Sequence, residues 1–298
     1  MNQKQNKRDT VKKTVREAYG KIARSGGGCC GAGCECGGTA RTANDMARGI
    51  GYAEEELSAL PEGANMGLSC GNPTALATLQ PGEAVLDLGS GGGFDVFIAG
   101  QKVGAAGRAI GVDMTPEMVS KARANTGVYR KRTGLDNVEF RLGEIEHLPV
   151  PDESVDVVIS NCVINLSDDK AQVWREIARV LRPGGRVAVS DIALLKPLPK
   201  KIAEMVEALV GCVAGAAMAS DTKRMMKEAG LTEVALTPKR EYMEALAPSQ
   251  DPLYRKILAA MPKGTRPSDY ATSMYISARK PGGRAGARSG RSRGRIGR

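Results

Sequence analysis

Beyond residue 75 the chain alternates short apolar runs with longer, partly polar segments. The apolar runs have the length and flanking residues of buried strands and lie at 83–89, 108–114, 137–143, 154–161 and 184–194. The segments predicted to be helices are 94–104, 115–132 and 167–181. Strands that alternate with helices indicate βαβ units, and hence a parallel sheet with ligands at the carboxyl ends of its strands.

The pattern changes after residue 200. The expected elements are a helix over 200–219, a helix over 220–230, a strand over 231–238, an irregular stretch over 240–268 and a strand over 273–280. The predicted fold class is therefore α/β: a mostly parallel seven-stranded sheet with helices on both faces, followed by a C-terminal α+β extension.

Local signals refine these boundaries. Thr115 is expected to cap the helix that starts at Pro116. Ser167 or Asp168 is expected to open the 167–181 helix. Near the start of the chain, apolar residues at three-to-four spacing predict an amphipathic helix over 8–23, and the glycine- and cysteine-rich run 25–38 is expected to be a loop.

The net charge of +10 first suggests a nucleic-acid-binding protein, but it is concentrated at the two ends. Residues 1–24 and the arginine-rich tail 281–298 each carry +6, so the body between them carries about −2. A body without basic excess argues against specific nucleic-acid binding. The tail is expected to be a solvated, disordered end.

The first 25 residues contain no apolar block of the kind found in a secretory leader. The apolar segment 202–219 carries Glu204 and Glu207 and is expected to be a buried helix rather than a membrane span. We therefore expect a cytoplasmic protein in a reducing compartment. Its seven cysteines are then expected to be ligands or redox-active thiols rather than a disulfide framework.

The stretch 87–95 (DLGSGGGFD) follows a strand and opens a helix. Its glycines, Gly89, Gly91 and Gly93, allow positive φ and a close approach of the backbone to a ligand. Asp87 before them would repel a pyrophosphate and attract an ammonium group, and Asp113 at the end of the next strand can accept ribose hydroxyls. An amino-acid tail and a ribose without phosphate describe S-adenosylmethionine. The alternative is a tight turn without a ligand.

This core resembles the class I methyltransferases, whose Rossmann-like fold it would share. Residues 143–149 (GEIEHLP) are similar to the family's adenine-contacting turn, and 181–191 (LRPGGRVAVSD) to its turn into the fifth strand. The cofactor contacts that the resemblance implies are Asp87, Gly89, Gly91, Gly93, Asp113, Met114, Glu144, Ile145, Glu146 and Asn161. The one histidine, His147, is interpreted as a surface or cofactor-side residue rather than a catalytic base.

The cysteines suggest a substrate. Cys162 follows the fourth strand, Cys70 lies in a turn before the core, and Cys212 lies on the expected 200–219 helix. A lone cysteine is usually a small buried hydrophobe, but Cys70 and Cys162 are expected in turns beside the active end of the sheet. A further four cysteines, Cys29, Cys30, Cys34 and Cys36, fall within eight residues.

The motifs around these thiols (SNCVINL, GLSCGNP, GCVAGA and the leading CC), with YGKIA near the start, resemble bacterial arsenite methyltransferases over about residues 14–280. The resemblance implies that Cys70, Cys162 and Cys212 bind arsenite as the substrate. It also implies that Cys30 or Cys29 relays arsenite or exchanges disulfides with Cys70, and that glutathione or thioredoxin reduces the enzyme. Cys34 and Cys36 are possible accessory thiols.

Trivalent arsenic is soft, binds thiolates and keeps a lone pair, so its attack on a sulfonium methyl needs no base. The implied products are methyl- and dimethylarsenicals, formed in arsenic detoxification. The implied organisation is a helix and Cys-rich loop (1–63), a cofactor-binding core (64–199), an arsenic-binding region (200–280) and a tail (281–298). A monomer is expected.

Two other functions stay open. The protein could methylate the carbon or oxygen of another small molecule and use its cysteines structurally. It could also be a non-catalytic thiolate protein that holds zinc in the 29–36 cluster, although the tight Cys34–Cys36 spacing would strain a four-sulfur site.

Overall fold

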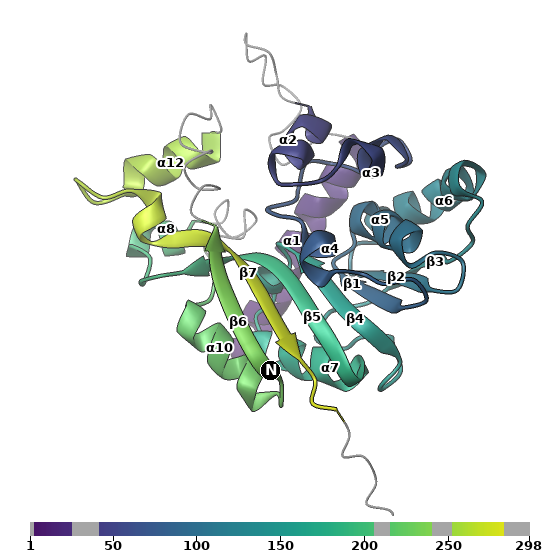
Figure 1. Ribbon diagram of the computed structural model, residues 1–298. Coiled ribbons are helices and arrows are strands. Elements are labelled where there is room, and N and C mark those ends of the chain that lie inside the picture. The colour runs from purple at the N-terminus through teal and green to yellow at the C-terminus, as the bar shows by residue number, and fades with distance from the viewer. Residues whose placement is uncertain (1–2, 26–41, 206–214, 240–251, 283–298) are drawn as a thin grey trace, which may run out of the picture.

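The computed structural model describes residues 3–25, 42–205, 215–239 and 252–282. The seven strands form one sheet in the order β3-β2-β1-β4-β5-β7-β6 (Figure 1). Their bounds are β1 Ala84–Leu88, β2 Arg108–Asp113, β3 Val138–Leu142, β4 Val155–Asn161, β5 Leu181–Leu194, β6 Thr232–Lys239 and β7 Ala271–Arg279. β1 to β5 pair in parallel, and β7 runs antiparallel between β5 and β6. The predicted fold class is confirmed.

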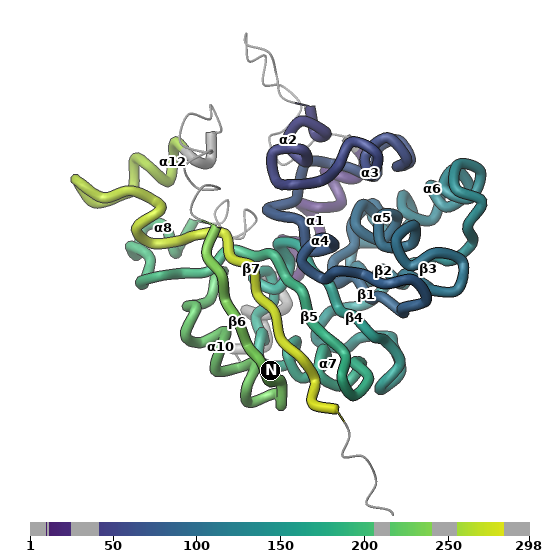
Figure 2. Tube along the Cα trace, in the orientation of Figure 1, coloured from purple at the N-terminus to yellow at the C-terminus, as the bar shows by residue number. Residues whose placement is uncertain are grey.

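The helices of the described residues lie on both faces of this sheet (Figures 1 and 2). Their bounds are α1 Gln3–Ser25, α2 Ala43–Gly49, α3 Glu54–Ser58, α4 Pro73–Ala77, α5 Phe94–Val103, α6 Pro116–Thr133, α7 Lys170–Val180, α8 Lys200–Ala203, α10 Ala219–Glu228 and α12 Pro252–Ala260. Two short 3₁₀ turns are Ile164–Leu166 and Pro267–Asp269. No helix among the described ranges has the length and apolar character needed to cross a membrane.

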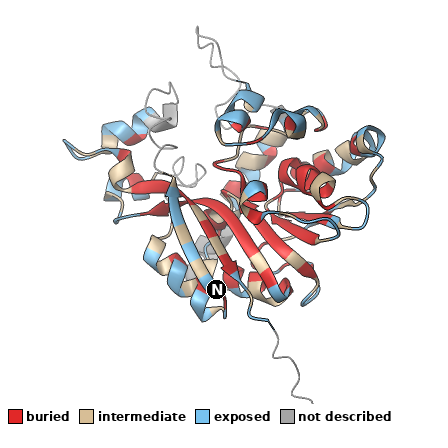
Figure 3. Cartoon of the chain, viewed as in Figure 1, coloured by how far each residue is buried: buried red, intermediate tan, exposed pale blue. Residues whose placement is uncertain are grey.

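Alternate residues of the central strands supply two separate hydrophobic cores, because successive side chains of a strand point to opposite faces. Leu86 and Leu88 of β1 pack in one core with Trp174 of α7. Val85 of the same strand packs in the other core with Phe97 of α5. All of β1 is consequently buried, whereas the edge strand β6 is largely exposed (Figure 3). The continuous apolar run at 83–89 reflects this two-sided burial.

The switch in strand order falls between β1 and β4, where chain connections leave in opposite directions. Ligands of open α/β sheets bind in the crevice at this point, beyond the carboxyl ends of the strands. Gly89 follows β1 and Cys162 follows β4, so the glycine loop and one thiol lie at the same crevice.

Several predicted boundaries are wrong. α7 starts at Lys170 and is capped by Asp169, which accepts a hydrogen bond from the backbone of Gln172, rather than by Ser167 or Asp168. Ser167 instead ends the 3₁₀ turn that follows β4, and Asp168 lies between that turn and the N-cap of α7. Thr115 is the N-cap of α6 as expected.

The C-terminal part differs more. The predicted 200–219 helix is not continuous: α8 ends at Ala203, and the chain around Ala217 is extended, with its carbonyl accepting a hydrogen bond from Leu194. The pairing of Ala217 and Met218 with Leu194 of β5 therefore replaces the helix that the sequence pattern predicts at these residues. Part of the stretch expected to be irregular, 240–268, is helix α12, and the rest of its described residues follow that helix.

Candidate active site

A cavity of about 1010 Å³, counting its open mouth, lies at the carboxyl ends of β1, β2 and β4. Most of the residues predicted to contact a cofactor line it: Asp87, Gly89, Gly91, Asp113, Met114, Ile145, Glu146 and Asn161. Cys162 lines the same cavity. Gly93 and Glu144 are not among the lining residues of the described chain. Most of the predicted cofactor residues and one predicted arsenic ligand therefore share one cavity.

The glycine loop is held in a conformation that side chains resist. Gly89, Gly91 and Gly93 have φ of 68°, 50° and 95°, in the region that favours glycine. The backbone N–H of Gly91 donates to the Asp113 carboxylate at 2.9 Å, so the end of β2 fixes the loop. A side chain on Gly93 would meet the rings of Phe97 and Phe140. Gly93 thus packs against these two rings and allows the turn of the loop, and it does not line the cavity.

Replacing Gly89 with alanine should destabilise the protein by about 2–4 kcal/mol. The new Cβ would lie 2.2 Å from Val163 Cγ2, so overpacking adds to the strain of positive φ. Gly134→Ala is the matched control, because Gly134 also has positive φ (72°), in the left-handed region, but open space around it, and should cost only ~1 kcal/mol. Urea denaturation of both variants measures the difference, and equal losses would contradict the role of Val163.

Three carboxyl groups gather at the cavity. Asp87 is buried, and burial raises its pKa well above the usual value, with the carboxylates of Asp95 and Asp113 raising it further. Burial likewise raises the pKa of Asp95 to about 6, against the hydrogen bonds from Tyr52 and Asn161 that lower it. Burial also raises the pKa of Asp113, opposed by the backbone N–H groups of Thr115 and Gly91. Crowded buried carboxyl groups favour a cationic ligand, which relieves their repulsion.

The donor set therefore fits S-adenosylmethionine. Asp87 offers a buried carboxylate for an ammonium group, and Asp113 offers two oxygens at the end of β2 for ribose hydroxyls. The turn after β3 contributes Ile145 and Glu146 to the wall, where an adenine would lie. A phosphate-bearing dinucleotide would meet repulsion from the same acids.

Helix α1 forms one wall of the cavity, which the sequence did not predict. Val15 is buried, and Lys12, Val15 and Tyr19 all line the cavity. Lys12 Nζ lies 2.6 Å from the carboxylate of Glu144 and 3.8 Å from that of Glu146. Glu144 therefore binds α1 to the turn after β3 instead of facing the cavity.

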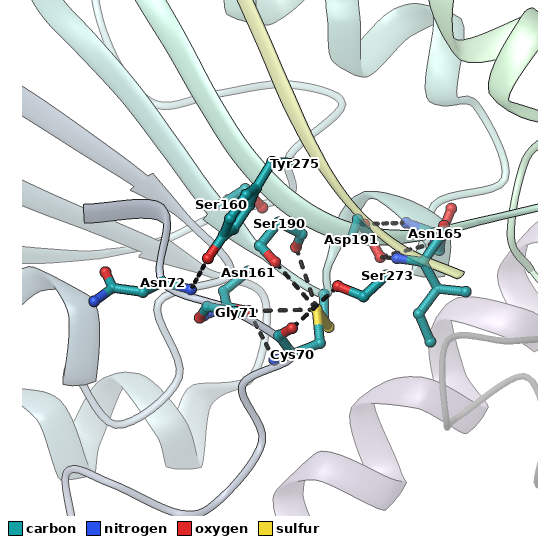
Figure 4. Close-up of a disulfide and its surroundings, with 12 residues drawn as sticks. Cys70, Gly71, Asn72, Ser160, Asn161, Asn165, Ser190, Asp191, Ser273 and Tyr275 are labelled. Carbon is teal, nitrogen blue, oxygen red and sulfur yellow. Dashed lines mark hydrogen bonds between the residues drawn. A yellow bond between two sulfur atoms is a disulfide. The ribbon is translucent and has the colours of Figure 1, made fainter. Parts of the chain in front are cut away.

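Cys70 and Cys162 are joined by a disulfide, with their Cα atoms 6.2 Å apart (Figure 4). Both are buried, in a small cluster that also contains Ile192, Leu194 and Ala216. The disulfide agrees with the expectation that these two cysteines are redox-active. In this oxidised state neither is a free thiol that could bind a ligand. The other five predicted thiols, Cys29, Cys30, Cys34, Cys36 and Cys212, lie outside the described residues. Within the described residues, no group of three or more His, Cys, Asp or Glu side chains is arranged to hold a metal ion.

A polar network that the sequence did not reveal links the cavity to Cys70. Tyr52 Oη donates to Asp95 Oδ1 at 2.6 Å, and Asn161 Nδ2 lies 3.2 Å from Asp95 Oδ2. The Asn161 amide also donates to Gly71 O at 2.8 Å and accepts from the backbone N–H of Cys70 at 3.0 Å. These residues are far apart in the sequence, and no spacing pattern connects them.

A second buried network lies on the far side of Cys162. Asn165 donates to Asp191 at 2.8 Å and to the carbonyl of Ile192 at 2.6 Å, and accepts from the backbone of Ala217 at 3.3 Å. Burial raises the pKa of Asp191 to about 7. The network fastens the turn after Cys162 to the end of β5 (Figure 4). His147 is exposed and does not line the cavity, as its interpretation as a surface residue required.

Comparisons with known proteins agree with this site. A family model described as a methyltransferase domain matches residues 79–230. The arsenite methyltransferase of Halobacterium salinarum is 49% identical over 80% of this chain and 62% of its own length. That of Aquipseudomonas alcaligenes is 43% identical over 53% of this chain and 46% of its own. The chain thus spans less than two thirds of these two curated relatives.

Among solved structures, the arsenic(III) S-adenosylmethionine methyltransferase of Chlamydomonas reinhardtii superposes with a TM-score of 0.56 at 31% identity, covering 80% of this chain and 74% of that one. The chain belongs to the methyltransferase-domain family and, within it, to the family of arsenic(III) S-adenosylmethionine methyltransferases.

Proposed function

We propose that this protein transfers methyl groups from S-adenosylmethionine to trivalent arsenic held by its thiolates, giving methyl- and dimethylarsenicals. One observation carries the proposal. Cys162 lines the cavity whose acids suit the cofactor, and Cys70 lies within disulfide distance of it. Two thiols beside a cofactor cavity can hold a soft metalloid in reach of a methyl donor.

The cofactor would be bound by the residues already described. S-adenosylmethionine supplies an electrophilic methyl group on a sulfonium. Asp87 would hold its ammonium group and Asp113 its ribose hydroxyls, while Met114, Ile145 and Glu146 would enclose the adenine. Helix α1 excludes water from this side, because Val15 and Tyr19 cover the cavity. The protein's contribution is thus orientation in a sheltered cavity, which alone can lower a barrier by several kcal/mol, ~7 or more in favourable cases.

Arsenic would bind only after the disulfide is reduced. A thiol reductant such as glutathione or thioredoxin donates two electrons to the Cys70–Cys162 disulfide and leaves as its own disulfide. The freed thiols then displace hydroxide from arsenite, and water leaves. Cys212 is proposed as the third ligand; Ala216, four residues further along the chain, packs in the buried cluster that contains Cys70 and Cys162. Cys29, Cys30, Cys34 and Cys36 are proposed as relay or accessory thiols.

No general base is required by this proposal. The arsenic lone pair is the nucleophile and carries no proton, so nothing must be removed before attack. The transfer releases S-adenosylhomocysteine and uses up the lone pair, so the thiol reductant must donate two electrons to return arsenic to the trivalent state before a second methyl group is added. The chain's single histidine is exposed and away from the cavity, which agrees with such a reaction. Nucleophilic oxygen or nitrogen substrates would instead need a positioned base.

The test is direct. The reduced protein is incubated with arsenite, glutathione and S-adenosylmethionine, and the arsenic species are separated by chromatography with elemental detection. Methylated arsenic that increases with enzyme concentration is expected. Arsenic that stays inorganic while S-adenosylhomocysteine still binds would leave a methyltransferase of another substrate and overturn the arsenic proposal.

A further inference from the structure

Cys70 lies in a segment without helix or strand, residues 65–72, that precedes α4. Cys162, by contrast, directly follows β4, and its backbone N–H donates to Ser190 O at 2.8 Å. The sheet therefore fixes Cys162 through its backbone, whereas it reaches Cys70 through a side chain of β7: Ser273 Oγ donates to Cys70 O at 3.2 Å. The distance between the two thiols depends on whatever holds the Cys70 segment in place.

Asn161 is placed to do this. It is the residue before Cys162, so its backbone shares that cysteine's position on β4. Its side-chain amide makes two hydrogen bonds to the backbone of Cys70 and Gly71: Oδ1 accepts from Cys70 N–H at 3.0 Å, and Nδ2 donates to Gly71 O at 2.8 Å (Figure 4). One side chain thus joins the two cysteine segments independently of the disulfide.

The orientation of this amide is also determined. Asp95 can only accept hydrogen bonds when ionised, and its Oδ2 lies 3.2 Å from Asn161 Nδ2. Tyr52 Oη donates to the other oxygen of Asp95 and holds that carboxylate. The amide nitrogen must therefore point toward Asp95 and Gly71, which leaves the amide oxygen facing Cys70.

We infer that Asn161 is a positioning residue that sets the spacing of the Cys70 and Cys162 thiols, and that Asp95 and Tyr52 hold its amide in the required orientation. The inference deepens the proposed function, because the same spacing would place arsenic. It can nevertheless be tested without arsenic, since preorganised thiols form a disulfide more readily than loosely held ones.

The experiment equilibrates the full-length protein with mixtures of glutathione and glutathione disulfide. Each dithiol that oxidises gives one protein disulfide and converts one glutathione disulfide into two glutathione molecules. Differential alkylation and peptide mass spectrometry then report the Cys70–Cys162 pair alone among the seven cysteines. Asn161→Ala should lower the equilibrium constant for disulfide formation by about tenfold, a shift of ~30 mV toward easier reduction.

Two further variants sharpen the test. Tyr52→Phe keeps the ring packed against Phe94 but loses the hydroxyl, and should shift the same equilibrium two- to threefold in the same direction. Asn165→Ala is the matched control: it is a buried asparagine three residues after Cys162 that bonds Asp191 and Ala217 but not the Cys70 segment. Its equilibrium constant should stay within twofold of wild type.

An unchanged constant in Asn161→Ala, or an equal shift in Asn165→Ala, would overturn the inference. If Asn161→Ala does not fold, the Tyr52→Phe variant provides the test. An unchanged equilibrium constant in Tyr52→Phe would then overturn the inference. A shifted constant in a protein that fails to methylate arsenite would refute the proposed function and leave the positioning role intact.

Discussion

Replacing Cys162 with serine should lower the rate of arsenite methylation at least ~100-fold, because a misplaced reacting group alone can cost that much. Serine offers a hard oxygen in place of a soft thiolate, so arsenic loses the ligand that lines the cavity. Initial rates with arsenite, glutathione and S-adenosylmethionine measure the effect. Both proteins are compared fully reduced, which removes the stabilising effect of the disulfide from the comparison.

The substitution should leave the cofactor side intact. Serine keeps the backbone N–H that donates to Ser190, and the affinity for S-adenosylhomocysteine, measured by calorimetry, should stay within about threefold of wild type. Cys70→Ser should behave alike, since it removes the other half of the pair. A Cys162→Ser variant that retains a third of the wild-type rate would show that Cys162 is structural and would favour a different methyl acceptor.

Replacing Asp87 with asparagine should weaken the binding of S-adenosylhomocysteine by about 30-fold, or ~2 kcal/mol, since a buried charge-assisted hydrogen bond is lost. The variant should also change the pH dependence. In the free protein burial raises the pKa of Asp87 well above its usual value, and the carboxylates of Asp95 and Asp113 raise it further, so this group keeps its proton to a higher pH than a free carboxyl group does. A ligand ammonium needs the ionised form. Wild-type affinity should therefore rise as the pH rises through this raised pKa, and that of Asp87→Asn should rise less.

Stability should move in the opposite direction. A carboxyl whose folded-state pKa is raised contributes most when protonated, and its contribution is lost as the pH rises through that raised pKa. The melting temperature of the free wild-type protein should thus fall as the pH rises through the raised pKa of Asp87, with a smaller decline in Asp87→Asn. Thermal unfolding at constant ionic strength, with and without S-adenosylhomocysteine, measures both trends. Identical pH profiles for the two proteins would exclude Asp87 as the titrating group.

The sequence predicted the features that depend on local pattern. The strands of the sheet were visible because two-sided burial makes continuous apolar runs, and the glycine loop because its backbone conformation excludes side chains. The positions of Asp87 and Asp113 at the cavity could also be predicted, because each lies at or near the carboxyl end of a strand whose direction follows from the alternating pattern. The thiols Cys70 and Cys162 were expected near one another, and they are.

Features that depend on distant contacts could not be predicted. The amphipathic pattern of α1 shows that the helix packs on something, but not that Lys12 and Val15 close the cavity against the turn after β3. Tyr52 and Asp95 lie 43 residues apart and carry no motif. The prediction of a continuous 200–219 helix was wrong because Met218 pairs with Leu194 of β5, and this pairing overrides the helical pattern of the sequence.

The disulfide has a consequence for the free energy of unfolding of the protein. Cys70 and Cys162 are separated by 92 positions, and the glycine loop, β1 to β4 and the three acids of the cavity all lie between them. Oxidation closes this part of the chain, about a third of its 298 residues, into a covalent ring, which in the chain-entropy account disfavours the unfolded chain by ~4–5 kcal/mol. Reduction, which arsenic capture would require, gives up that protection. The oxidised protein should therefore have a larger free energy of unfolding than the reduced protein.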